Sequence, residues 1–119
     1  MERVRLMTHS GKQILLVDLA HCSAAEVEKI VRGLPDHLSK QPPRSALLIT
    51  DFTGASFDED CLRTMKETAI FDKPYVKKSA WIGSESLPTA FRQDVSKFSG
   101  REFSVFRTLI DAMEWLAKD

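Results

Sequence analysis

Residues 46–62 of the chain are ALLITDFTGASFDEDCL, a stretch that passes from an apolar block through a turn into an acidic segment. The apolar block, residues 46–49, is typical of a strand that is buried on both faces. Gly54 marks the turn after it. A helix is then indicated by acidic residues at its start and by apolar residues at helical spacing (Asp58, Glu59, Asp60; Leu62, Met65, Ala69). The stretch therefore predicts a strand followed by a helix.

The same pattern precedes this unit. Residues 14–17 form another apolar run, which ends in Asp18. Ser23 and Glu26 have the spacing of a capping box and predict the start of a helix that ends before residues 42–43, a proline pair. The apolar stripe of this helix repeats every three or four residues: Ala24, Val27, Ile30, Val31 and Leu34.

The pattern also continues toward the C-terminus. Residues 79–83 and residues 103–106 predict two more strands. Pro88 suits the first turn of a helix that ends at Gly100 and has Phe91, Val95 and Phe98 as its apolar residues. Thr108 and Asp111 open a last helix, which carries Ala112, Met113 and Leu116.

The first residues add a hairpin to these alternating units. Val4 and Leu6 alternate with arginines, and residues 9–12 form a turn before the strand at residues 14–17. The resulting order is ββαβαβαβα, and strands alternating with helices favour a mostly parallel sheet. We therefore predict an α/β protein of one domain, residues 1–119, with a five-stranded sheet, an N-terminal antiparallel hairpin and four helices.

Composition excludes several classes of function. Lysine and arginine number 17 and aspartate and glutamate number 17, so the net charge is zero and we expect no nucleic-acid partner. Cys22 and Cys61 fit no metal-ligand pattern, and we expect reduced thiols, no metal and no cofactor. Because no stretch approaches the roughly 18 apolar residues of a membrane span, we expect a soluble, cytoplasmic protein.

Polar residues gather where the predicted strands end. In open α/β sheets, ligands bind beyond the carboxyl ends of the strands. We therefore expect a binding site to include the polar residues that follow the strands: Asp18, His21, Asp51, Thr53, Ser84 and Ser86.

Asp18 and Asp51 allow more than one interpretation. If their strands are neighbours, the two carboxylates could act as a general acid and a general base. Alternatively, each aspartate accepts backbone hydrogen bonds in an Asx turn or a helix cap, which is common at strand ends. A third interpretation has Asp51 as a phosphoryl acceptor, but Val17 and Leu19 leave Asp18 without the acidic neighbour that would help to hold magnesium.

A family resemblance adds to these patterns. Residues 46–62 resemble the strand, turn and helix start of STAS domains, the superfamily of the anti-sigma-factor antagonists. Residues 73–83 (KPYVKKSAWIG), 98–101 (FSGR) and 112–116 (AMEWL) are similar, more specifically, to its SpoIIAA-like (STAS/SEC14-type) branch. The likeness spans nearly the whole chain and implies a STAS-like domain.

The resemblance also bears on regulation. In the partner-switching antagonists of this superfamily, a serine at the start of the second helix is phosphorylated. Asp60 stands at that position here, between Glu59 and Cys61, so we do not carry the phosphoserine switch over. Asp60 joins the strand-end residues as a candidate contact to a partner.

Taken with the lack of a nucleophile, base and oxyanion arrangement, the resemblance predicts a non-enzymatic regulatory or binding module of the bacterial SpoIIAA-like type. Its partner would be a protein or an apolar, lipid-like small molecule. Two alternatives stay open. One is a small enzyme that uses Asp18 and Asp51, and the other is a self-associating scaffold, such as a homodimer, that pairs through the hairpin edge or the last helix.

Overall fold

The computed structural model of the protein describes residues 2–118, except for the side chain of Phe98. These residues form the predicted order of strands and helices. The strands are β1 (Val4–His9), β2 (Lys12–Asp18), β3 (Ala46–Asp51), β4 (Val76–Ile82) and β5 (Ser104–Phe106). The helices are α1 (Ala24–Leu38), α2 (Glu59–Asp72), α3 (Thr89–Ser99) and α4 (Leu109–Ala117), and a short 3-10 helix, η1 (Ser84–Ser86), lies between β4 and α3.

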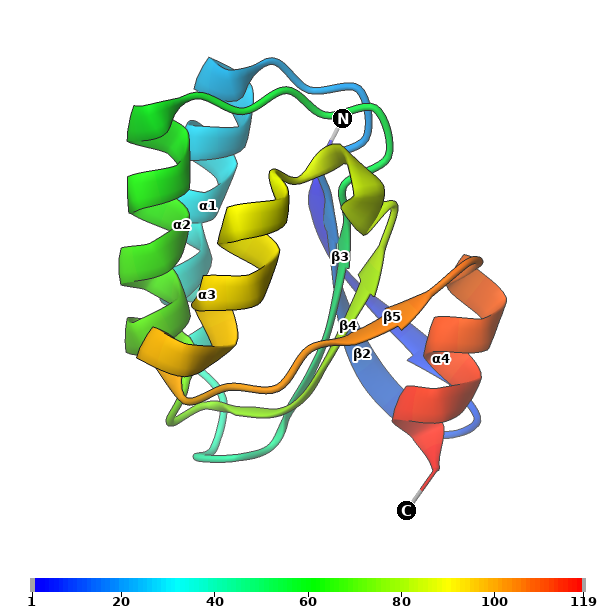
Figure 1. Cartoon of the computed structure of the whole chain (residues 1–119). Helices are drawn as coiled ribbons and strands as arrows, with labels where there is room; N and C mark the ends of the chain where they lie inside the picture. The colour runs from blue at the N-terminus through cyan, green and yellow to red at the C-terminus, as the bar shows by residue number, and fades with distance from the viewer. Residues whose placement is uncertain (1, 119) are drawn as a thin grey trace.

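Within the described residues, the five strands form one mixed sheet in the order β1-β2-β3-β4-β5. β1 and β2 are antiparallel, and β2 to β5 are parallel. Each crossover moves one strand along the sheet in the same direction, so right-handed crossovers place α1, α2 and α3 on one face. Figure 1 shows this layer of three helices, with α4 on the opposite face. The predicted α/β fold class is confirmed.

The sheet separates two apolar cores. The larger core lies under α1, α2 and α3 and includes Val17 and Leu48, whereas the smaller core lies under α4 and includes Leu16 and Ile49. Successive residues of a strand point to opposite faces. Because β2 and β3 are covered on both faces, their central residues are apolar without alternation, as the sequence predicts.

The start of α1 follows the predicted capping box. Ser23 Oγ accepts a hydrogen bond from Glu26 N at 3.2 Å, and Glu26 Oε1 accepts one from Ser23 N at 3.0 Å. α1 runs through Pro35 to the fully buried Leu38, whose packing offsets the hydrogen bond that a proline removes, and so ends before residues 42–43 as predicted. The start of α3 differs from the prediction. Pro88 is the N-cap of α3 rather than a residue of its first turn.

Two turns use the residues expected of them. Ser10 and Gly11, at φ 51° and 76°, connect β1 and β2 in a two-residue hairpin turn. Gly100 ends α3 at φ 66°, the left-handed conformation that glycine adopts easily. The side chain of Phe98, predicted for the buried face of α3, lies outside the described residues.

β4 begins earlier than the sequence predicts. It starts at Val76, which is the register partner of Ala46, whereas the pattern indicates a start at Ser79. The next pair is Lys78 with Leu47, so the register shifts by one residue at Lys77. Two lysines and this irregularity hide the apolar pattern in the first half of the strand.

Candidate functional site

The loops after β2, β3 and β4 lie side by side at the carboxyl end of the sheet. His21 N donates a hydrogen bond to Thr53 O at 2.8 Å, and Phe52 N donates one to Ile82 O at 2.8 Å. These bonds continue the parallel ladder beyond the strands. They bring together the candidate residues of the first two loops.

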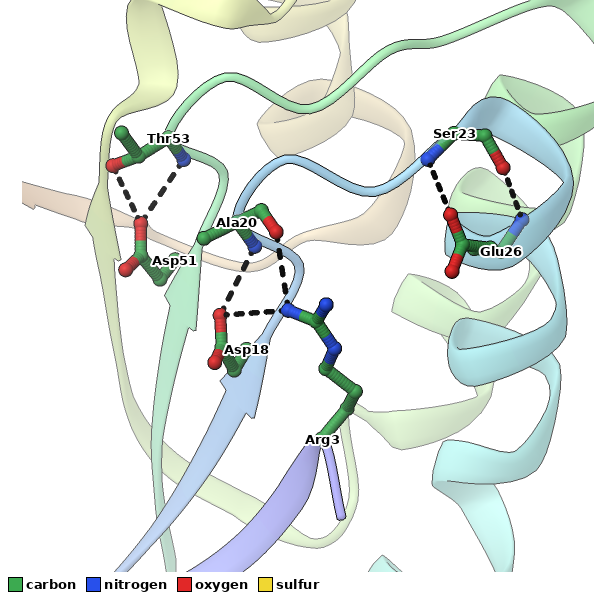
Figure 2. A network of polar contacts seen from close by, with 7 residues as sticks. All are labelled: Arg3, Asp18, Ala20, Ser23, Glu26, Asp51 and Thr53. Carbon is green, nitrogen blue, oxygen red and sulfur yellow. Dashed lines mark hydrogen bonds and ion pairs between the residues drawn. The ribbon is translucent and has the colours of Figure 1, made fainter. Parts of the chain in front are cut away.

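Asp18 and Asp51 are neighbours in the sheet. They are register partners in the parallel pair of β2 and β3, so their side chains project from the same face. Asp18 Oδ1 accepts a hydrogen bond from Ala20 N at 3.0 Å and lies 3.5 Å from Arg3 Nη1. Asp51 Oδ1 accepts hydrogen bonds from Thr53 N at 3.0 Å and from Thr53 Oγ1 at 2.7 Å. Figure 2 shows each carboxylate turned toward its own loop, which is the geometry of the Asx-turn interpretation.

Close backbone contacts hold the three loops together. His21 has a left-handed backbone at φ 59°, and a Cβ added to Gly54 would lie 2.4 Å from His21 Nδ1. A Cβ added to Gly83 would lie 2.6 Å from Thr53 N. The imidazole of His21 therefore lies directly on the backbone of Gly54. At these two positions, the loops leave no room for a ligand between them.

The other predicted site residues are dispersed. Ser84 is buried in η1, and Ser86 at the end of η1 is half-buried. Asp60 is exposed in the first turn of α2, where its Oδ1 lies 3.2 Å from Arg63 Nη1 one turn further along. The carboxyl end of the sheet thus presents His21 and Thr53 to solvent, while Ser84 is buried and the carboxylates of Asp18 and Asp51 accept hydrogen bonds from their own loops.

Metal and thiol chemistry find little support. Among residues 2–118, no group of three or more histidine, cysteine, aspartate or glutamate residues could hold a metal ion. Cys22 and Cys61 are free and buried, and burial raises the pKa of both thiols, that of Cys61 to about 11. Both are structural thiols rather than nucleophiles.

In the described part of the chain, none of the helices has the length and apolar character that crossing a bilayer requires.

A cavity of about 60 Å³ lies in the larger core, between the sheet and the layer of α1, α2 and α3. Its lining is mostly apolar and buried, and includes Val17, Leu48, Met65, Trp81, Phe91 and Val95. Four polar residues also contribute to the wall: Thr50, Thr68, Asp72 and Arg101. The cavity is partly open, and the strand-end residues His21, Thr53, Ser84 and Ser86 are not part of its wall.

Two buried charged residues form part of this wall. Asp72, the last residue of α2, is 2% exposed, and its Oδ1 has no hydrogen-bond partner among the described residues. Burial raises the pKa of the Asp72 carboxyl to about 7, although the positive charge of Arg101 acts in the opposite direction. Arg101 Nη1 donates to Ala69 O at 3.2 Å, and Nη2 donates to Ser79 Oγ at 2.7 Å. The guanidinium also lies 4.8 Å from the centre of the Phe103 ring.

Sequence reasoning missed both of these residues. Asp72 continues the spacing of Leu62, Met65 and Ala69, so an acidic residue on the buried stripe of α2 was an available signal. Arg101 follows a helix-ending glycine, where no periodicity marks a side chain as buried. Its burial results from tertiary packing alone.

The cavity and the aspartate pair lie on opposite faces of the sheet. Leu16 and Ile49 belong to the core under α4, and Asp18 and Asp51 lie two residues further along the same strands, on the same face. Val17 faces the other side and lines the cavity. The aspartate pair therefore does not contribute to the cavity.

Comparison with known proteins shows the fold. No protein-family model and no curated protein matches the chain. A solved structure that it resembles is the crystal structure of an uncharacterized protein of the DUF3478 family with a SpoIIAA-like fold, from Shewanella loihica PV-4. The two share 16% sequence identity with a TM-score of 0.73, and the likeness covers 96% of this chain and 92% of that one. The SpoIIAA-like fold implied by the sequence resemblance is confirmed.

Proposed function

We propose that this protein is a binding module that holds a small, largely apolar molecule in the cavity between the sheet and the layer of α1, α2 and α3. The observation that carries the proposal is the cavity itself, a partly open space of about 60 Å³ lined mostly by buried side chains. Apolar walls with a few polar groups are characteristic of small-molecule sites. The proposal is the small-molecule form of the binding role expected from the sequence.

The energetics of packing favour an occupied cavity. Protein cores are as dense as organic crystals and contain few voids larger than a water molecule. At about 24 cal/mol per Å³, an empty space of about 60 Å³ lowers the free energy of unfolding by roughly 1.4 kcal/mol. A bound molecule restores the missing dispersion contacts. Because an engineered cavity of about 150 Å³ accommodates benzene, the molecule bound here has only a few heavy atoms.

Binding without catalysis fits the residues around the cavity. Among the described residues that line it, none is a serine, cysteine or histidine. Covalent catalysis by such a nucleophile beside its base therefore has no candidate in the cavity wall. Asp18 and Asp51, the pair considered for acid and base catalysis, lie across the sheet and hydrogen-bond their own loops.

A titration followed by NMR tests the proposal. Furan is a suitable probe because it is a small, mainly apolar ring without a hydrogen-bond donor. We expect saturable binding, with chemical-shift changes concentrated on residues that line the cavity, such as Val31 and Val95. Val31→Ile adds a methyl group to the cavity and should weaken furan binding several-fold.

Val27→Ile is the matched control. Val27 lies on the same helix and is fully buried, but it does not line the cavity, so its replacement should leave furan affinity closer to that of the parent. Absence of saturable binding would count against the proposal. Equal loss of affinity in both variants would show that the probe senses general core packing rather than this cavity.

A further inference from the structure

Asp72 gives the cavity a chemical preference. The carboxylate is 2% exposed, lines the cavity and has one oxygen, Oδ1, without a hydrogen-bond partner among the described residues. Buried polar atoms in folded proteins almost always have a partner, supplied by the protein, by water or by a ligand. We therefore expect a hydrogen-bond donor to occupy the cavity beside Asp72 Oδ1.

Two of the polar residues beside Asp72, Arg101 and Thr68, direct their hydrogen bonds elsewhere. The two terminal nitrogens of Arg101 donate to Ala69 O and Ser79 Oγ. The hydroxyl of Thr68, one turn before Asp72 on α2, donates to backbone carbonyls of its own helix. With no protein group bonded to it, Asp72 Oδ1 is open to a donor from water or from a molecule inside the cavity.

The charges around the cavity limit what this molecule can be. A cation would approach the buried guanidinium of Arg101, and an anion would approach the carboxylate of Asp72. Both would also lose their hydration in an apolar space. A neutral molecule meets neither difficulty, since an O–H or N–H group donates to a carboxylate without carrying a net charge.

We propose that the molecule bound in the cavity is a neutral one whose single hydroxyl or N–H group donates a hydrogen bond to Asp72 Oδ1, while its apolar part contacts the rest of the wall. This inference rests on the proposed function, because it specifies the ligand of the same cavity. It assigns Asp72 as the residue that selects for a hydrogen-bond donor.

Pyrrole and furan provide a direct test, since the two five-membered rings have nearly the same size and only pyrrole has an N–H donor. The titrations are run at pH 8, above the pKa of about 7 of Asp72, so that the carboxylate is mostly ionised. We expect pyrrole to bind about tenfold more tightly than furan, the scale expected for a hydrogen bond to a charged acceptor.

Asp72→Leu removes the acceptor and keeps the branched shape of the side chain; its larger methyl groups should weaken the binding of both rings alike and make the two affinities equal. Asp72→Asn, which keeps a weaker, uncharged acceptor, should give an intermediate preference and serves if the leucine variant does not fold. Asp94→Asn, an exposed change on α3, is the control and should keep the full preference.

The outcomes separate the two proposals. Equal binding of pyrrole and furan to the parent protein overturns the role of Asp72 and leaves the proposed function standing. A pyrrole preference that persists in both Asp72 variants overturns it as well. If neither ring binds, the proposed function fails first and the inference fails with it.

Discussion

Asp18 and Asp51 stand side by side on neighbouring parallel strands, yet each carboxylate accepts its hydrogen bonds from its own loop. Two like charges at adjacent register positions repel each other. The positive charge of Arg3, whose Nη1 lies 3.5 Å from Asp18 Oδ1, offsets part of the negative charge of Asp18. The N–H and the hydroxyl of Thr53 stabilise the carboxylate of Asp51 by donating hydrogen bonds to it. The pair is thus held by the turn geometry of its two loops.

Removing one of these acceptors should reduce stability. In Asp51→Ala, the N–H and the hydroxyl of Thr53 lose their partner, and we expect the free energy of unfolding to fall by about 1–2 kcal/mol. Urea denaturation measures the change. Asp94→Ala, on an exposed face, should stay within about 0.5 kcal/mol of the parent. An unchanged stability in Asp51→Ala would contradict the Asx-turn account.

Gly83 should tolerate no side chain. It has a φ of 67°, and an added Cβ would lie 2.6 Å from Thr53 N, a backbone atom that cannot move without shifting the loop. We expect Gly83→Ala to lower the free energy of unfolding by about 3 kcal/mol or more, since strain and a clash add. Gly11→Ala is the matched control, because Gly11 has a similar φ of 76° but open space around it, and should cost about 1 kcal/mol. Equal losses would show that the loops can separate.

Two of the three acids at the start of α2, Asp58 and Asp60, should differ in their effect on stability. Asp58 is the N-cap, and its Oδ1 accepts a hydrogen bond from Cys61 N at 2.8 Å, so Asp58→Ala should cost about 1 kcal/mol. Asp60 makes an exposed ion pair with Arg63, and Asp60→Ala should cost less than about 0.5 kcal/mol. Thermal unfolding of the parent and the two variants measures both losses of stability. A larger loss in Asp60→Ala would reverse these roles.

Local sequence features were the most predictable part of the structure. The capping box of Ser23 and Glu26, the turn at Gly11 and the helix end at Gly100 depend on nearby residues, and all three occur as predicted. Residues 14–17 and 46–49 also revealed strands with two covered faces. Each of these features follows from backbone conformation or from burial, and the residue types within a short stretch of sequence indicate both.

The location of the cavity depends on information that local patterns lack. The expectation of a site at the strand ends assumes helices on both sides of a parallel sheet, with a crevice where the strand order reverses. Here the strand order is sequential, so α1, α2 and α3 share one face and no reversal occurs among the described strands. The walls that contain Asp72 and Arg101 are separated along the chain and meet only after the layers pack.

The two thiols should react only when the protein unfolds. Cys22 is 1% exposed and Cys61 is fully buried. With its pKa raised to about 11, Cys61 is a thiolate in only about one molecule in a thousand at pH 8. We expect Ellman's reagent to label both thiols rapidly in urea and slowly in native buffer, at a rate limited by opening of the structure. Rapid labelling of either native thiol would contradict its burial.

Asp72 should make stability depend on pH in an unusual direction. Its pKa is about 7 in the folded protein, above the ordinary value of 3.8 that we assign to the unfolded chain. Between these two values the folded state holds the proton more strongly, so the free energy of unfolding should fall as pH rises from about 4 to about 7 and level off above. The difference between the two pKa values corresponds to about 4 kcal/mol. This is the free energy of unfolding that is lost when the carboxyl of Asp72 is ionised inside the core.

Comparison with Asp72→Asn isolates this contribution from those of the other titrating groups. Well below pH 4 the carboxyl of the parent is neutral in the folded and the unfolded state, whereas above pH 7 only the parent buries a charge. The stability of Asp72→Asn relative to the parent should therefore increase with pH across this interval. Urea denaturation at pH 4, 5, 6, 7 and 8 measures the difference, and Asp94→Asn should follow the parent throughout. A constant difference between Asp72→Asn and the parent would mean that Asp72 is ionised as easily in the folded protein as in the unfolded chain, and that a donor, from the protein or from a bound molecule, already satisfies its carboxylate.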